Sequence, residues 1–319
     1  MINRGYDVYV LARDKEVTRQ LLDAYQIEYF SGTKKRHGFM CFLELFEWFA
    51  IARKIIRQHQ IDIVVSIGSP AGAWAAKTYN IFHLAFNDTE TAREQRLLYK
   101  PASTKIFTPS CVLSDFGSKQ VRYNGTHDLA YLRPEWFTPD ISVRKNLYLK
   151  TNETYAILRF VSWQATHDWN KKCTDTDFQR AIVSLVSKKH RVVISAEGKL
   201  PPDLEQYRLN LPAEQLHDAM ACASVVIGDG STTLTEAAAL GVPALYISPF
   251  ADSLGCLRFY GKYGLLCSVK TKKDAIKKIQ KLLKYPDRAG RDKRRMRMLD
   301  ETIDVSAYIA DQCCSYLQV

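Results

Sequence analysis

The sequence predicts an α/β protein made of two Rossmann-like domains, and three observations support this prediction. Short, nearly continuous apolar runs such as residues 61–67 are typical of buried parallel strands. These runs alternate with amphipathic patterns of helical period, which is the order of a doubly wound fold. The alternation stops over residues 133–152, where two prolines and many polar residues show no periodicity. We therefore expect an N-terminal domain over residues 1–140 and a C-terminal domain over residues 141–319.

The N-terminal domain is expected to lack its own first elements. Residues 3–6 have the pattern of a helix end with Gly5 as the C-cap, and a strand over residues 7–12 follows. A doubly wound domain ordinarily opens with a central strand, a glycine-containing loop and a helix. We expect that this first strand, the loop and most of the helix are missing, through a misassigned start codon or a genuine truncation.

Periodicity and end signals predict the remaining elements of the N-terminal domain. Asp14 is expected to cap a helix, and Ser69 before Pro70 marks the start of another. The expected strands are residues 27–30, 61–67, 81–85 and 104–107, and the expected helices are residues 14–26, 39–58, 70–79 and 90–98.

The same alternation resumes in the C-terminal domain. It predicts further parallel strands, each followed by a helix that crosses back over the sheet. The expected strands are residues 155–161, 191–196, 224–227 and 243–247, and the expected helices are residues 175–188, 214–222, 232–240, 272–284 and from Gly290 onward.

The composition excludes several classes of protein. Hydrophobic residues at 46% and charged residues at 25% match an ordinary folded chain and argue against global disorder. The eight cysteines include no C-x-x-C pair and the seven histidines lack ligand spacing, so neither a disulfide scaffold nor a metal site is expected. The first residues lack the apolar core of a signal peptide, and no apolar run is long enough to span a bilayer. A cytoplasmic location is therefore expected.

Nearly all of the net charge of +11 lies in residues 270–297, which contain 13 Lys and Arg but only three Asp. The favoured interpretation is two helices whose apolar stripes pack on the protein and whose cations are solvated. The second interpretation is peripheral contact with anionic lipid at the inner face of a membrane. Nucleic acid is not expected as a partner, because no alternation of basic and aromatic residues accompanies the charge.

Residues 226–245 form the most informative segment, which reads as a strand, a glycine-rich turn and a helix. The N–H groups and dipole at such a helix N-terminus suit a phosphate. Gly228 and Gly230 would let a ligand approach the backbone, and Glu236, about one turn into the helix, would accept hydrogen bonds from two ribose hydroxyls. The structural alternative is a turn capped by Ser or Thr, with a buried Glu. No Walker lysine and only half of a G-x-G-x-x-G pattern are present, which argues against an ATPase and a dinucleotide enzyme.

This segment resembles the donor-site motif of GT-B glycosyltransferases and of the UDP-N-acetylglucosamine 2-epimerase group, which reads roughly G-G-x-x-T-x-x-E-A-x-x-x-G-x-P. Nearly the whole chain is similar to the domain-of-unknown-function 354 family. The stretches that carry this second resemblance are "RDKEVTRQLLDAYQIEY" (13–29), "DIVVSIGSPAGAWAA" (62–76), "FNDTE" (86–90), "LAYLRPEWFTPD" (129–140) and "LRFVSWQATHD" (158–168).

The resemblance implies a GT-B-like fold with two domains facing a cleft, a nucleotide sugar on the C-terminal domain and the acceptor on the N-terminal domain. It also implies transfer without a metal or another cofactor. Asp229 departs from the motif, which often has Gly or Ser there, and would place a negative charge near the diphosphate. By position, the resemblance assigns the diphosphate to Ser231, Thr232 and Thr233, the ribose to Glu236, and donor-sugar hydroxyls to Asp252.

Loops after other strands supply the remaining candidates. Arg159 would neutralise a diphosphate and His167 would donate to the leaving phosphate or donor sugar. The alternative is that Arg159 pairs with a core carboxylate and His167 caps a turn. An inverting transfer needs a base for the acceptor hydroxyl, and Asp88 and Glu90 are the best-placed carboxylates. Residue by residue, the favoured alternative is that Asp88 is an N-cap and Glu90 lies in the first helical turn.

These observations predict a glycosyltransferase that uses a nucleotide-diphosphate sugar in the assembly of surface polysaccharide, with a glycan or a lipid-linked acceptor. A nucleotide-sugar epimerase is the enzymatic alternative. A catalytically silent protein that binds a sugar nucleotide or a partner is the alternative of another class.

Overall fold

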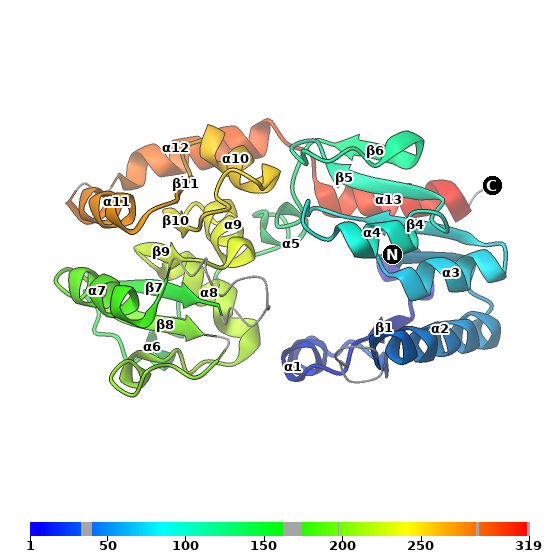
Figure 1. Ribbon diagram of the computed structural model, residues 1–319, viewed down its shortest axis with the longest axis horizontal. Helices are drawn as coiled ribbons and strands as arrows, with labels where there is room; N and C mark the ends of the chain where they lie inside the picture. The colour runs from blue at the N-terminus through cyan, green and yellow to red at the C-terminus, as the bar shows by residue number, and fades with distance from the viewer. Residues whose placement is uncertain (33–39, 162–173, 197, 285–286, 318–319) are drawn as a thin grey trace. The chain divides into compact units, whose positions relative to one another are not determined.

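The computed structural model describes residues 1–319 except 33–39, 162–173, 197, 285–286 and 318–319. Contacts divide the chain into two α/β units (Figure 1). Unit 1 comprises Met1–His127 together with Asp304–Val319, and unit 2 comprises Asp128–Ile303. This division differs from the expected domains, because the boundary lies before residue 140 and the last helix returns to the first unit.

Unit 1 contains two parallel sheets, one of strands β1 and β2 and one with the order β3-β4-β5-β6. Its short 3-10 helix ends at Gly5, whose φ of 83° is the left-handed conformation expected of a C-cap glycine. The strands are β1 (Val10–Ala12), β2 (Tyr29–Ser31), β3 (Ile63–Ser66), β4 (Phe82–Phe86), β5 (Lys105–Pro109) and β6 (Gln120–Tyr123). The helices are η1 (Ile2–Arg4), α1 (Glu16–Ala24), α2 (Met40–His59), α3 (Pro70–Thr78), α4 (Arg93–Tyr99), η2 (Gly117–Lys119) and α13 (Val305–Leu317).

The last helix belongs to unit 1 because its aromatic side chains pack on the strands of that unit. Tyr308 contacts Phe107 of β5 and Tyr123 of β6, with ring centroids 6.1 and 5.4 Å away. Tyr316 contacts Phe82 of β4 at 5.1 Å. Burial of several aromatic rings stabilises this packing, although α13 follows unit 2 in the sequence. The expected C-terminal domain over residues 141–319 was therefore wrong to include this helix.

Unit 2 is built on one parallel sheet with the strand order β11-β10-β9-β7-β8. The strands are β7 (Tyr155–Phe160), β8 (Arg191–Ala196), β9 (Val225–Gly228), β10 (Ala244–Ile247) and β11 (Leu266–Val269). The helices are α5 (Leu129–Leu132), α6 (Val143–Asn146), α7 (Thr176–Val186), η3 (Glu205–Tyr207), η4 (Ala213–Gln215), α8 (Leu216–Cys222), α9 (Ser231–Ala239), α10 (Gly255–Lys262), α11 (Lys272–Lys284) and α12 (Arg288–Asp300).

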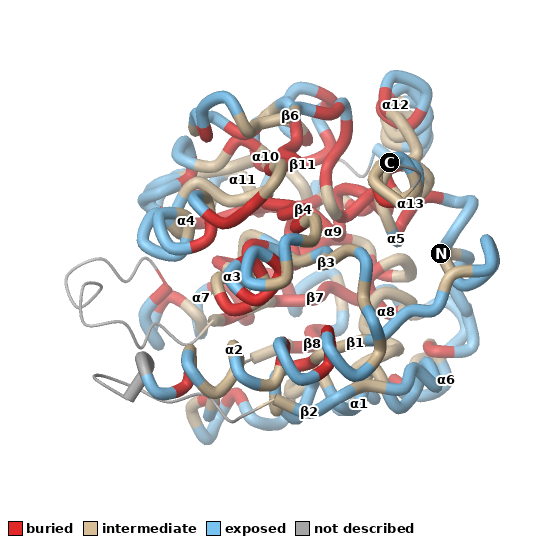
Figure 2. The backbone as a smooth tube through the Cα atoms, turned by 90° about the vertical axis from the view of Figure 1, so that its right-hand side faces the viewer, coloured by how far each residue is buried: buried red, intermediate tan, exposed pale blue. Residues whose placement is uncertain are grey.

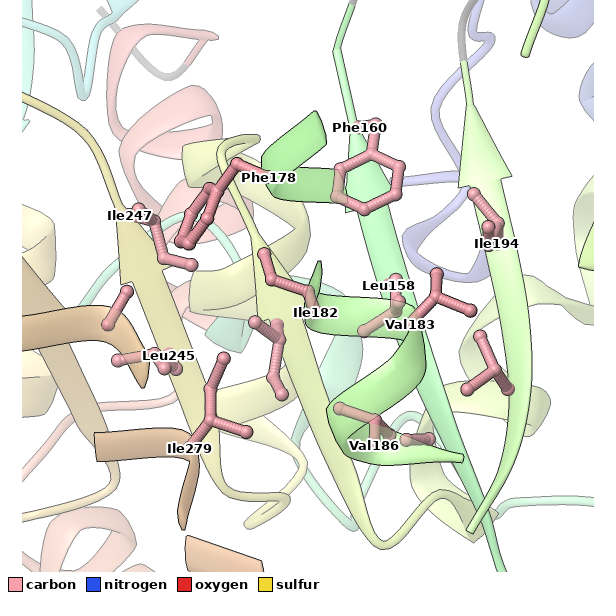
Figure 3. Close-up of a cluster of buried hydrophobic side chains, with 14 of the residues drawn as sticks. Leu158, Phe160, Phe178, Ile182, Val183, Val186, Ile194, Leu245, Ile247 and Ile279 are labelled. Carbon is pink, nitrogen blue, oxygen red and sulfur yellow. The ribbon is translucent and has the colours of Figure 1, made fainter. Parts of the chain in front are cut away.

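The core of unit 2 lies between one face of this sheet and two helices. Figure 3 shows Phe178, Ile182 and Val183 of α7 and Ile279 of α11 directed at Leu158 and other apolar side chains of the strands. In Figure 2 the strands β4 and β7 are drawn largely as buried, whereas α1 is largely exposed. Burial of both faces explains why strands such as β7 are nearly continuous apolar runs.

The fold class is confirmed, and most predicted elements are present with ends shifted by a few residues. Asp14 does not cap α1, however. The N-cap is Lys15, and the Asp14 carboxylate pairs with Arg19 one turn later, at 3.2 Å. The predictions contained no β6, α10, β11 or α13.

Within the described residues, no helix is both long and apolar enough to cross a membrane. The same part of the chain contains no group of three or more His, Cys, Asp or Glu side chains arranged to hold a metal ion. The six cysteines whose state the structure describes are in the reduced form.

Candidate functional site

The turn between β9 and α9 is built around close contact with the neighbouring strand β7. Arg159 of β7 lies in register with Gly228. A Cβ atom at Gly228 would collide with the carbonyl oxygen of Arg159, and one at Gly230 would lie 3.0 Å from the Cγ atom of Arg159. The sequence predicted that these glycines admit a ligand. The structure shows that they also make room for Arg159, and the approach of a ligand stays a prediction.

Arg159 therefore lies beside the first turn of α9. Its Nη1 donates to Ser195 Oγ at 3.0 Å, and its aliphatic stem passes over Gly230, the N-cap residue. A guanidinium group at a helix N-terminus adds a full positive charge to the partial charge of the helix dipole. The contact of Nη1 is with a serine hydroxyl, and the alternative pairing of Arg159 with a core carboxylate stays untested.

The first turn of α9 is not closed by a capping side chain. The N-cap is Gly230, so the capping by Ser or Thr that belonged to the structural alternative is absent from this described turn. Ser231 is half-buried, Thr232 is exposed and Thr233 is buried. The hydroxyl groups of Ser231 and Thr232 are therefore the two that a ligand at this turn would meet first.

Asp229 directs its carboxylate into the protein. The side chain is buried, and its Oδ1 accepts a hydrogen bond from the backbone N–H of Val161 at 2.9 Å. Its Oδ2 accepts from the hydroxyl group of Thr174. These bonds give the departure from the family motif a structural role, because they tie the ends of β7 and β9 together with residue 174.

Glu236 lies about one turn further along α9 and is buried among groups that donate to it. Its Oε1 accepts from the hydroxyl of Tyr131 at 2.9 Å and lies 3.2 Å from Nε2 of His217. The ring of His217 in turn contacts Tyr131 and Phe137, with centroids 5.6 and 6.1 Å away. A buried Glu was part of the structural alternative, and this feature is present. Tyr131 and His217 were missed, since nothing in their spacing points to α9.

Asp252 follows β10 on an exposed loop. Its carboxylate forms an ion pair with Lys270, and its carbonyl oxygen accepts from Nη2 of Arg258 at 2.6 Å. The hydrogen bond from Lys270 holds the pKa of Asp252 below its ordinary value. A donor-sugar contact at Asp252 stays a prediction. His167 lies outside the described residues.

In unit 1, Asp88 pairs with a histidine that the sequence did not single out. The Oδ2 atom of Asp88 lies 3.4 Å from Nδ1 of His127, whose ring stacks on Tyr123 at 6.2 Å and contacts Phe86 at 6.4 Å. Burial would raise the pKa of Asp88, but the hydrogen bond and charge of His127 outweigh it, so this pKa lies below its ordinary value. Nε2 of His127 is buried and has no hydrogen-bond partner in the described part of the chain.

Neither carboxylate of this loop takes the capping role that the sequence favoured. The helix α4 begins at Arg93 with Ala92 as its N-cap, so Asp88 is not a cap and Glu90 is not in the first turn. The Oε1 atom of Glu90 instead accepts from the backbone N–H of Leu113 at 3.0 Å, which ties two loops together. Asp88 has a titratable partner in His127.

Comparison with models of protein families shows to which family the chain belongs. The model of the family described as protein of unknown function (DUF354) matches residues 2–318. The chain belongs to the DUF354 family. This membership confirms the resemblance that the sequence suggested, over nearly the whole length of this DUF354 protein. No curated protein matches its sequence significantly.

Solved structures show the same fold at low sequence identity. UDP-GlcNAc 2-epimerase from Neisseria meningitidis, bound to UDP-GlcNAc, superposes with a TM-score of 0.65 at 14% identity, over 97% of this chain and 91% of that one. The spinosyn forosaminyltransferase SpnP gives 0.63 at 14%, over 99% and 93%. MurG from Acinetobacter baumannii gives 0.54 at 15%, over 98% and 91%. This DUF354 protein therefore has the α/β fold with parallel sheets of GT-B glycosyltransferases and epimerases.

Proposed function

We propose that this DUF354 protein is a glycosyltransferase whose donor is a nucleotide-diphosphate sugar bound to unit 2. The position of Arg159 over Gly230, beside the uncapped N-terminus of α9, carries the proposal. A cation and a helix N-terminus that converge suit a diphosphate. Glu236 of the same helix supports it. Tyr131 of α5 and His217 of α8 both lie against its Oε1, and a carboxylate has further lone pairs that suit the hydroxyl groups of a ribose.

In this proposal, each donor-site residue acts through a charge or a hydrogen bond. Arg159 and the α9 dipole stabilise the negative charge of the departing nucleoside diphosphate. Ser231 and Thr232 donate from their hydroxyl groups, and buried Thr233 contributes its backbone N–H. Gly228 and Gly230 keep the turn close enough to β7 for Arg159 to reach it. Asp252 binds hydroxyl groups of the donor sugar.

His127 is proposed as the general base that accepts the proton of the acceptor hydroxyl, after the side chains that cover its buried Nε2 have moved aside. If Nδ1 carries the hydrogen that faces Asp88, Nε2 has a free lone pair, which is the form a base requires. The negative charge of Asp88 then stabilises the imidazolium that forms. Glu90, held by Leu113, has no direct part in this step.

The finer parts of the proposal concern the acceptor and the cellular setting. The acceptor is a glycan or a lipid-linked glycan, the setting is surface polysaccharide biosynthesis in the cytoplasm, and the reaction uses no metal or other cofactor. The membership in a family with GT-B structural neighbours supports a nucleotide-sugar reaction of this class.

A nucleotide-sugar epimerase is the second candidate, and the similarity to the Neisseria enzyme bound to UDP-GlcNAc favours it.

Product analysis separates the two candidates. The purified protein is incubated with a panel of sugar nucleotides, with and without polysaccharide and polyprenyl-phosphate glycan acceptors, and the products are separated by chromatography. Release of a nucleoside diphosphate that requires an acceptor supports transfer. Conversion of the sugar nucleotide alone supports the epimerase. Binding without either reaction would contradict both enzymatic proposals and indicate the silent binding protein.

A further inference from the structure

The basic segment 270–297 separates into two helices that use their cations in different ways. The arginines of α12 are engaged with unit 2 itself. Two of them donate to backbone carbonyl groups near the end of α9, and two others pair with carboxylates. These contacts are Arg295 Nε to Ala239 O at 2.8 Å, Arg291 Nη1 to Gly241 O at 3.2 Å, Arg294 Nη1 to Asp287 Oδ2 at 2.9 Å and Arg297 Nε to Glu301 Oε1 at 2.7 Å.

The helix α11 has an apolar face that is covered by its own unit. Ala275 and Ile279 are buried, and Ile276, Leu282 and Leu283 pack against the same core cluster. Figure 3 shows Ile279 directed at the side chains that cover the sheet. This face is consequently not available to insert into a bilayer.

The opposite face of α11 carries a row of exposed lysines, which we name the α11 lysine stripe. At about 100° per residue, its members fall within an arc of about 80° and extend over about 12 Å. This arc lies on the other side of the helix from Ile279. The stripe consists of Lys273, Lys277 and Lys281, all of which are exposed.

Three carboxylates near this helix interact with groups outside the stripe. The one acidic residue within α11, Asp274, accepts from the hydroxyl of Thr271 at 2.6 Å. Asp175 pairs with Lys272, and Asp252 pairs with Lys270. The stripe therefore keeps a concentrated positive charge on one exposed helix face.

We propose that the α11 lysine stripe binds the anionic headgroups of a lipid bilayer. Lysines are flexible point charges, which suit mobile headgroups better than the fixed fork of an arginine does. No aromatic residue occurs in α11 on which a base of a single-stranded nucleic acid would stack. Because the apolar face is buried, the protein adsorbs to the membrane surface by charge alone. This surface is separate from the proposed donor site, and the inference does not depend on the proposed function.

Co-sedimentation with vesicles tests this proposal on the full chain. Wild-type protein is expected to bind vesicles that contain phosphatidylglycerol and not vesicles of phosphatidylcholine alone. The triple variant K273Q/K277Q/K281Q is expected to bind about a hundredfold more weakly, since each lysine contributes about fivefold near an anionic surface. Raising the salt concentration from about 0.05 to 0.5 M is expected to release the wild type, because screening then acts within a few ångströms.

A matched variant distinguishes the effect of the α11 lysine stripe on vesicle binding from the effect of net charge alone. K188Q/K189Q/K199Q removes the same charge from exposed lysines elsewhere in unit 2 and is expected to bind within about threefold of wild type. Thermal unfolding of both variants checks that they fold. Equal loss in the two variants, unchanged binding in the stripe variant, salt-resistant binding, or absence of wild-type binding to anionic vesicles would each overturn the proposal. Stripe-dependent binding to duplex DNA that exceeds binding to the vesicles would overturn it as well.

Discussion

Arg295 of α12 donates from Nε to the carbonyl oxygen of Ala239, at a distance of 2.8 Å, in the last turn of α9. The C-terminal end of a helix carries a partial negative charge, and its last carbonyl groups lack partners within the helix. A guanidinium group there satisfies both needs. The same helix thus has an arginine at each end, with Arg159 at its N-terminus and Arg295 at its C-terminus.

The substitution Arg295→Met is expected to destabilise the protein while keeping much of the buried stem. The hydrogen bond to Ala239 and a longer one to the carbonyl of Leu132, at 3.4 Å, are lost. A hydrogen bond to a charged group contributes about 1.5–3 kcal/mol. The bond to Leu132 is longer than an ordinary hydrogen bond, so the bond to Ala239 dominates and a loss of about 2 kcal/mol in the free energy of unfolding is expected. Denaturant unfolding measures it. Lys293→Met, on the same helix at an exposed position, is the control and is expected to change this free energy by less than about 0.5 kcal/mol.

The close approach of β7 and β9 predicts that alanine at Gly228 is far more destabilising than alanine at Gly261, a glycine with space around it. Gly228→Ala places a Cβ against the carbonyl oxygen of Arg159, and the backbone must shift, at a cost of about 3 kcal/mol or more in the free energy of unfolding. Gly261→Ala, within α10, has its nearest neighbour at 3.7 Å and is expected to stabilise by about 0.5–1 kcal/mol. Similar effects of the two substitutions on denaturant unfolding would show that the close approach is not present.

Stability is expected to fall in mild acid because of His83. This buried side chain lies between two serine hydroxyls, with Ser66 Oγ 2.9 Å from Nε2 and Ser103 Oγ 2.9 Å from Nδ1. Burial lowers the pKa of His83 to about 4, against 6.5 in the unfolded chain. The unfolded state therefore binds the proton first, and stability is complete above pH 6.5 and declines as the pH falls toward 4.

The size of this effect follows from the two pKa values of His83. Between pH 7.5 and 4.5 the loss is about 2.5 kcal/mol in the free energy of unfolding. Thermal unfolding of His83→Gln across this range isolates it from other groups, since glutamine does not titrate. The pH dependence of the variant is expected to be shallower than that of wild type. Identical pH dependence in the two proteins would contradict the assignment.

The proposed role of His127 as the general base predicts how turnover responds to substitution of Asp88. Asp88→Asn removes the charge that faces His127 and favours the wrong tautomer, so kcat is expected to fall by about a hundredfold or more with little change in KM. Glu90→Gln keeps an oxygen that accepts from Leu113 and is expected to leave kcat within a few-fold of wild type. Steady-state kinetics on both variants decide which carboxylate of this loop matters. A larger loss in Glu90→Gln than in Asp88→Asn would contradict the role of His127.

Local patterns predicted the fold class, the alternation of strands and helices, and the helix end at Gly5. These features depend on neighbours within a few residues, where periodicity and steric preference act. The membership of α13 in unit 1 could not be predicted, because it rests on contacts such as that between Tyr308 and Phe107. The short strand β11 lacked the long apolar run that revealed β3.

The candidate site could also be predicted only in part, because local patterns do not reveal contacts between residues far apart in sequence. The motif 226–245 located the α9 turn and Glu236 from residue types alone. The partners of Glu236 could not be found that way, since Tyr131 lies 105 residues away in sequence. His127 escaped notice because its role rests on the distance to Asp88 and on the aromatic rings around it, which only the folded chain supplies.

Isothermal titration calorimetry with a nucleoside diphosphate tests the central claim most directly. A panel of diphosphates, each with its 2′-deoxy analogue, is titrated into wild type, Arg159→Gln and Glu236→Gln. We expect the diphosphate of one nucleoside to bind to the wild type. Its affinity for Arg159→Gln is expected to be ten- to a hundredfold weaker, as for the loss of a charged hydrogen bond. Glu236→Gln is expected to lose the preference for ribose over deoxyribose. No binding of any diphosphate to a cooperatively folded wild-type protein would contradict the donor site at α9.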